Sequence, residues 1–210
     1  MTDFLRYLSL FNYAEVLTLF VSVFQYIRGK KWLGIVVFFA AVSVTVEVFL
    51  GYILALKYNN NDLLYNIYSF FCPAFYLYMY NRYFISQSWS KILRYTTIAW
   101  FAISIVVLVS SERSFESFPY YSGMVFTTIL IFVYFYQTLY LDDYRDLTRE
   151  GMFYFSLGLI LFIFTSFTIL VFFNELTSQD MPVFFFRLLQ FGNLFLWAGC
   201  LGLVLCPKMW

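Results

Sequence analysis

The sequence predicts an all-α, polytopic membrane protein, a bundle of seven transmembrane helices that forms one domain over residues 1–210. The first observation is composition: 62% of the residues are hydrophobic and 12% are charged, against about 25% charged in soluble domains. The second is that the charges fall at the edges of seven long apolar runs, each near the length of about 20 residues that crosses hydrocarbon. The runs should be helical, because the alternating pattern of a barrel is missing.

Charged residues bound every run. The expected spans are 9–27, 32–56, 63–81, 95–110, 119–141, 152–173 and 183–206. In chain order they lie between Arg6 and Arg28, Lys31 and Lys57, Asp62 and Arg82, Arg94 and Glu112, Glu116 and Asp142, Glu150 and Glu175, and Asp180 and Lys208. The fourth run is the shortest. The third contains Pro73, which we expect to kink its helix. Because the connections are short, binding or catalysis must use the bundle or its rims.

Lysines and arginines predict the orientation, because they concentrate on the cytoplasmic side of a membrane protein. Nine follow the odd-numbered spans: Arg28, Lys30, Lys31, Arg82, Lys91, Arg94, Arg145, Arg149 and Lys208. Three lie on the other side: Arg6, Lys57 and Arg113. This bias places the N-terminus outside and the C-terminus in the cytoplasm, and it agrees with an odd number of spans.

Three charged residues lie inside the spans: Glu15 in the first, Glu47 in the second and Arg187 in the seventh. Such a charge costs at least about 2.5 to 3.5 kcal/mol on insertion scales, so it usually faces protein or water and marks function. Each of the three belongs to a polar or small-residue face of its helix. These faces are Glu15, Thr18, Ser22 and Gln25; Ala40, Ser43, Glu47, Gly51 and Ala55; and Arg187 with Gln190.

The three charges share a depth. At a rise of 1.5 Å per residue, Glu15, Glu47 and Arg187 lie roughly 9, 13 and 6 Å below the outer edge. Arg187 could therefore bridge both glutamates, and a carboxyl pair that shares one cation favours keeping one proton. Two interpretations stay open. The cluster is either a structural staple or a ligand, ion or proton site, and in a third case Arg187 reaches the outer interface and contacts neither acid.

The third span begins with a polar segment that includes Asn66, which we add to the candidate pocket. From this segment, a stripe of residues runs down one face of the expected helix. Its members are Tyr65, Tyr68, Cys72, Tyr76, Tyr80 and Tyr83. Their hydroxyl groups could line a cavity, but tyrosine is also a common packing residue, and packing is the favoured interpretation.

Several kinds of chemistry are excluded by what the sequence lacks. The chain contains no histidine, which removes zinc sites of the H-E-x-x-H type, His-ligated haem and a Ser-His dyad. The net charge of +1 provides no basic stripe for nucleic acid. We therefore expect no cofactor and no nucleic-acid partner.

One acidic pattern could hold a metal. Asp142, Asp143 and Asp146 have the D-D-x-x-D spacing of enzymes that bind magnesium diphosphate, and acids spaced by three and four residues share a helix face. Such enzymes need a second acidic motif, which is missing here, so a solvated loop is the favoured interpretation.

The first 85 residues carry a resemblance. Ala14-Glu15, Glu47 and the run Leu64-Tyr65-Asn66-Ile67-Tyr68-Ser69-Phe70 resemble small, aromatic-rich seven-helix membrane proteins of Bacteroidota. The resemblance implies a protein of the bacterial cytoplasmic membrane that serves a signalling system through a separate partner. It implies no activity and no site residues.

The sequence thus predicts a non-enzymatic sensor or binding subunit embedded in the lipid bilayer. Its pocket in the outer half would contain Glu15, Glu47, Arg187, Gln190 and Asn66, and would bind an unknown small ligand. The alternatives are a small-solute or proton-coupled transporter, in which Glu47 titrates, and a magnesium-dependent lipid or prenyl enzyme at the cytoplasmic face.

Overall fold

The computed structural model describes residues 10–50, 53, 62–83, 87–110, 118–140, 147–173 and 181–206. These residues form helices and no strand, which confirms the all-α prediction. Two compact units are present, one comprising Met1–Ile53 with Asp146–Trp210 and the other Leu54–Arg145. The expectation of a single domain stays a prediction, and the two units are described separately.

Among the described residues, six helical segments are long and apolar enough to cross a membrane, which indicates a multi-pass membrane protein. They are Leu10–Ile27, Lys31–Leu50, Lys91–Ser110, Phe118–Tyr140, Gly151–Thr168 and Arg187–Leu205. The third predicted span is also helical, as α5 (Asp62–Tyr83), but its tyrosines and asparagines keep it outside this set. The count of seven spans and the orientation therefore stay predictions.

The first unit contains α2 (Leu10–Ile27), η1 (Lys31–Leu33), α3 (Gly34–Ser43) and η2 (Val44–Leu50), followed by η3 (Leu147–Arg149), α8 (Gly151–Phe173) and α9 (Met181–Leu205). Gly29 makes the turn after α2, with a φ of 107° that favours glycine. At this turn the Lys30 ammonium donates hydrogen bonds of 3.2 and 3.1 Å to the Val204 and Cys206 carbonyl oxygens. These carbonyls lie at the C-terminal end of α9, where backbone carbonyls lack partners within the helix, so Lys30 joins the turn after α2 to this end of α9.

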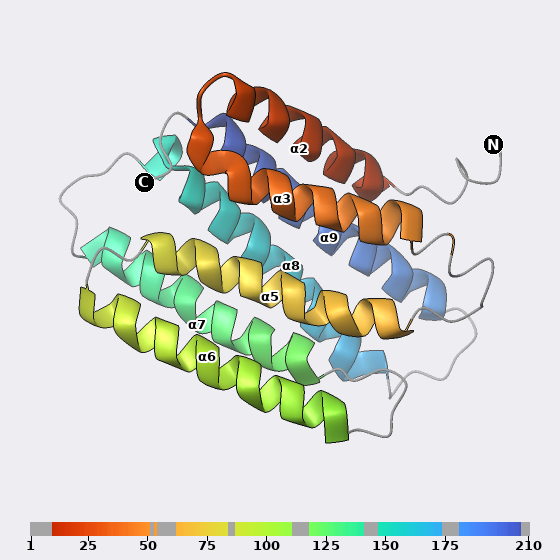
Figure 1. The fold of residues 1–210 in the computed structure, drawn as a ribbon. Helices are drawn as coiled ribbons and strands as arrows, with labels where there is room; N and C mark the ends of the chain where they lie inside the picture. The colour runs from red at the N-terminus through yellow and green to blue at the C-terminus, as the bar shows by residue number, and fades with distance from the viewer. Residues whose placement is uncertain are drawn as a thin grey trace. The chain divides into compact units, whose positions relative to one another are not determined.

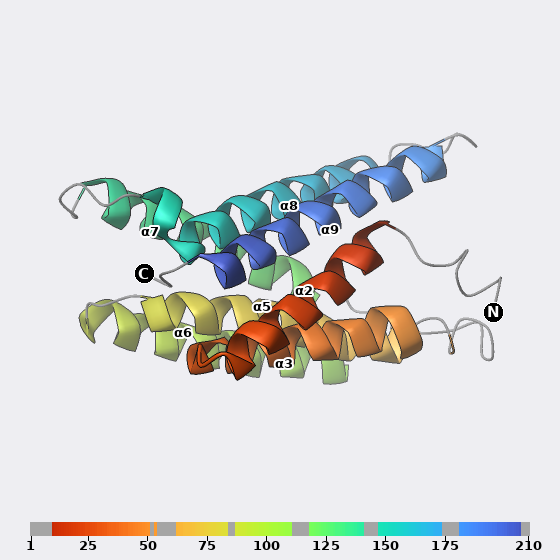
Figure 2. The ribbon, with the colours of Figure 1, turned by 90° about the horizontal axis from the view of Figure 1, so that it is seen from above.

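Glycines bring α8 and α9 together, and the two helices run side by side in Figures 1 and 2. A Cβ atom at Gly158 would overlap the Phe195 carbonyl oxygen and lie 2.8 Å from the Gly199 Cα atom. One at Gly199 would lie 2.8 Å from the Tyr154 carbonyl oxygen. The two backbones are therefore in direct contact, as small residues permit inside a membrane.

The second unit contains α5, α6 (Gln87–Ser110) and α7 (Phe118–Tyr140), which contact one another (Figure 1). Gly123 of α7 leaves room for Pro73 of α5 and for the Trp100 ring of α6. The Trp100 indole nitrogen donates a 2.9 Å hydrogen bond to the Ser122 hydroxyl group. Pro73 lies inside a continuous α5, and the predicted kink stays a prediction.

The tyrosine stripe of α5 packs where the structure describes it. Cys72, Tyr76 and Tyr80 are buried, and the Tyr80 ring lies 6.3 Å from that of Tyr134 in α7. The favoured interpretation, packing, is confirmed for these three residues.

Two predicted spans differ in detail. The fourth was expected at 95–110, but α6 begins at Gln87, because exposed Lys91 and Arg94 are good helix formers that reach water from a helix end. The second span is not a regular α-helix, since η2 is a π-helix. The sequence shows no proline or glycine within η2 that would predict this change.

The contact between α8 and α9 predicts a large effect of Gly199→Leu, because the new side chain must separate two backbones. Overpacking costs typically about 1 to 3 kcal/mol. Ala198→Leu is the matched control, because the neighbouring Ala198 is exposed. Thermal unfolding in detergent should show a clear loss for Gly199→Leu and little change for Ala198→Leu. Equal effects would contradict the contact.

Candidate functional site

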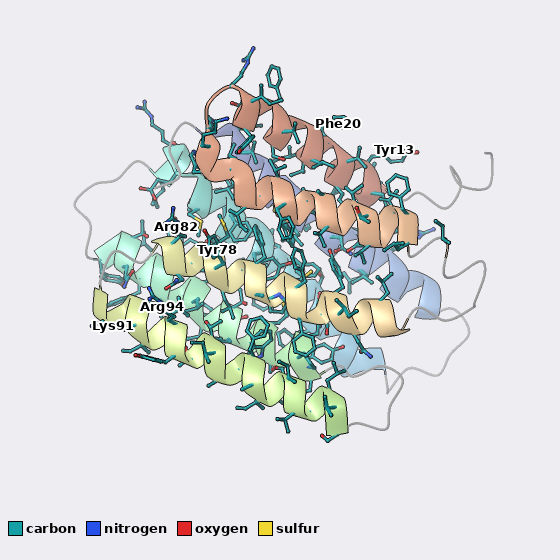
Figure 3. All side chains as sticks on the ribbon, in the orientation of Figure 1. Tyr13, Phe20, Tyr78, Arg82, Lys91 and Arg94 are labelled. Carbon is teal, nitrogen blue, oxygen red and sulfur yellow. The ribbon has the colours of Figure 1, made fainter. Side chains whose placement is uncertain are left out.

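Helix α2 buries its polar side. Its four buried residues are Asn12, Glu15, Thr18 and Ser22, at spacings of three, three and four that place them on one face. The opposite face is apolar and exposed, as for Tyr13 and Phe20, whose side chains are labelled in Figure 3. This arrangement is the reverse of a helix on a water-soluble protein, and it fits a helix with lipid on its outer side.

The buried face of α2 packs against α3, η2 and α9. The Thr18 hydroxyl group donates a 2.7 Å hydrogen bond to the Ala14 carbonyl oxygen. It also lies 3.5 Å from the Trp197 carbonyl oxygen of α9, a second and longer hydrogen bond. The Trp197 ring is buried and stacks on Phe39 of α3 at 5.6 Å. The polar face is therefore covered by the neighbouring helices α3 and α9.

Glu15 is the least compensated member of this face. Its side chain is 0% exposed, and neither carboxyl oxygen has a hydrogen-bond partner in the described part of the chain. The Asn12 side chain lies beside the carboxyl group, and Glu47 is near enough for electrostatic repulsion. Buried polar groups are nearly always paired, so this carboxyl group lacks an expected partner.

Glu47 approaches from η2, where it is partly exposed. Ala40 and Ser43, which precede it on the predicted small-residue face, are buried. The other two small residues of that face, Gly51 and Ala55, lie outside the described residues. Single π-helical turns occur frequently at functional sites, and here such a turn carries the second acid of the pair.

The structure does not join Arg187 to this pair. Arg187 is exposed on α9, and within the described residues no ion pair links it to Glu15. Gln190 is partly exposed on the same helix. Asn66 is buried in α5 and belongs to the other unit. Of the predicted five-residue pocket, the structure brings together Glu15 and Glu47.

The candidate metal site of Asp142, Asp143 and Asp146 lies outside the described residues and stays a prediction. Across the segments that are described, no group of three or more His, Cys, Asp or Glu side chains could hold a metal ion.

Sequence reasoning missed Asn12, which lies one turn before Glu15. The signal was available, because a spacing of three continues the polar face toward the N-terminus. Gln25, which was expected on that face, is only partly buried.

The stability of variants at Arg187 and Glu15 distinguishes a structural staple from a binding site. If Arg187 tied the acids together, Arg187→Leu would strongly destabilise the protein, because it would leave buried charge unpaired. Its exposure predicts a change within about 0.5 kcal/mol. Glu15→Leu should be neutral or stabilising, since it replaces an unsatisfied buried carboxyl group by an apolar side chain. Thermal unfolding in detergent measures both. A large loss for either variant would indicate a staple.

No protein-family model, curated protein or solved structure matches this chain.

Proposed function

We propose that this protein is a seven-helix membrane protein that binds a small cationic ligand or a proton between Glu15 and Glu47. It acts as a non-enzymatic sensor or binding subunit. The observation that carries the proposal is the fully buried Glu15 carboxyl group, which has no hydrogen-bond partner among the described residues and lies near a second acid.

The charge that would compensate the buried Glu15 carboxylate has to be positive. Glu15 is fully buried and Glu47 is partly exposed nearby, so the two carboxylates repel each other and the buried one favours neutralisation. An uncompensated carboxylate also costs several kcal/mol to desolvate. Because Arg187 is exposed and forms no ion pair with Glu15, the compensating positive charge has to come from outside the described residues. A proton or a small cation supplies it.

The orientation with the N-terminus outside is part of this proposal. Within the first unit, the hydrogen bonds from Lys30 to the end of α9 and the approach of Gly151 to Leu203 gather basic residues at one end. Lys30, Lys31, Arg28 and Arg149 lie there, while Arg187 lies near the start of α9. A basic end of this kind favours the cytoplasm. Glu15 is then nearer to the outer side.

The alternative is proton- or cation-coupled transport, which the same pair of acids would support. Alternating access in transporters usually involves broken helices and internal repeats. The helices α8 and α9 instead form a tight pair through their glycine contacts. Among the described residues, the π-helical turn η2 is a local irregularity. Sensing is therefore the better-supported function, with a separate partner for output, as the resemblance to bacterial seven-helix proteins implies.

Ligand binding is tested by thermal unfolding of the detergent-purified protein with sodium, potassium and short alkylammonium ions at several pH values. Binding at tenfold or more above the dissociation constant raises the midpoint by about 2 to 6 °C. We expect the increase in the parent protein and its loss in Glu15→Gln, which keeps the shape but not the charge. Glu112→Gln, in a connection between predicted spans, is the matched control. A response that survives in both Glu15→Gln and Glu47→Gln would refute the site.

Sensing and transport are separated in proteoliposomes. We expect no pH-dependent or cation-dependent flux above that of empty liposomes. Uptake that disappears in Glu47→Gln would identify a transporter and refute the sensor.

The orientation is tested by fusions to the C-terminus. A fluorescent protein folds and fluoresces there if the end is cytoplasmic, whereas alkaline phosphatase is active only outside the cytoplasm. We expect fluorescence and no phosphatase activity in a bacterial host. The reverse pattern would overturn the orientation without affecting the buried acid pair.

A further inference from the structure

Three cations gather where α5 ends and α6 begins. Arg82 lies in the last turn of α5, and Lys91 and Arg94 lie near the start of α6. All three side chains are exposed. Figure 3 shows them, with Tyr78, at the same end of these two packed helices.

These cations have no protein partner within the described residues. No hydrogen bond, ion pair or ring contact engages Arg82, Lys91 or Arg94 in that part of the chain. Two basic residues of the first unit differ, because Lys30 donates to carbonyl oxygens and the Arg28 guanidinium lies 4.1 Å from the centre of the Phe24 ring. Within the described residues, the charge of the cluster of Arg82, Lys91 and Arg94 is therefore not neutralised by the protein.

An apolar surface continues from this cluster along α6. Tyr95, Ile98, Ile105 and Val109 follow Lys91 at spacings of three, four and seven that keep them on one face, and all are exposed, Tyr95 to 71% and Val109 to 81%. Tyr78, one turn before Arg82 on α5, is exposed as well. Tyrosines beside a cationic end mark the headgroup level of a membrane. The ligand that fits this surface has an anionic head and a long apolar tail.

We propose that Arg82, Lys91 and Arg94 bind the phosphate of an anionic phospholipid, whose acyl chains lie along the exposed face of α6. Two guanidinium groups can each contact phosphate oxygens in a bidentate manner, and the lysine adds a point charge. This site is in the second unit and does not depend on Glu15 or Glu47.

The test is a titration of the detergent-purified protein with dansyl-labelled phosphatidylglycerol, followed by energy transfer from tryptophan. Dansyl-labelled phosphatidylcholine serves as the neutral lipid. We expect tight binding of phosphatidylglycerol only. Each of Arg82→Gln, Lys91→Gln and Arg94→Gln should weaken it about fivefold, and the triple variant on the order of a hundredfold. Arg187→Gln is the control, since it removes an exposed cation elsewhere in the chain.

Three results would overturn the proposal. The first is phosphatidylglycerol binding that the triple variant retains, and the second is an equal loss in Arg187→Gln, which would indicate nonspecific attraction to net charge. The third is displacement of the labelled lipid by millimolar inorganic phosphate, because the site would then bind free phosphate. Thermal unfolding of the triple variant, expected to match the parent protein, shows that a loss of binding is not a loss of fold.

Discussion

Polar groups inside hydrocarbon must find partners within the protein, because no water is available to them. Helix α2 shows the consequence. All four of its buried residues are polar, whereas its large apolar side chains face outward. The packing of α2 against α3 and α9 therefore depends on this polar face being covered, and Thr18 contributes by donating to the Trp197 carbonyl oxygen. The same constraint makes the unsatisfied carboxyl group of Glu15 informative.

Within the first unit, the helix pair α8–α9 provides the frame against which α2 is placed. Gly158 and Gly199 remove the side chains that would hold the two backbones apart, so van der Waals contact replaces the hydrophobic effect that is missing between helices in lipid. Lys30 adds a polar connection at one end of this frame. Of the two acids, Glu15 is therefore positioned by the packing of α2, and Glu47 by the π-helical turn η2.

Helix limits could be read largely from the sequence, because a change from apolar to charged residues coincides with the end of a span. The predicted run 9–27 corresponds to α2 at Leu10–Ile27, and 119–141 to α7 at Phe118–Tyr140. The rule was wrong at the start of α6, where Lys91 and Arg94 are inside the helix. Charge marks where a helix leaves hydrocarbon, but a helix can continue beyond that level.

The sequence by itself determined the helical class, the approximate limits of several helices and the polar face of α2, since each depends on local composition and on the 3.6-residue period. Only the tertiary structure decided which charges meet. Glu15 and Glu47 approach each other, whereas Arg187, at a similar predicted depth, is exposed. The physical reason is rotational: depth along a helix follows from counting residues, but the direction in which a side chain points relative to a neighbouring helix depends on packing. The glycine contacts of α8 with α9 and the π-helical turn of η2 establish that packing.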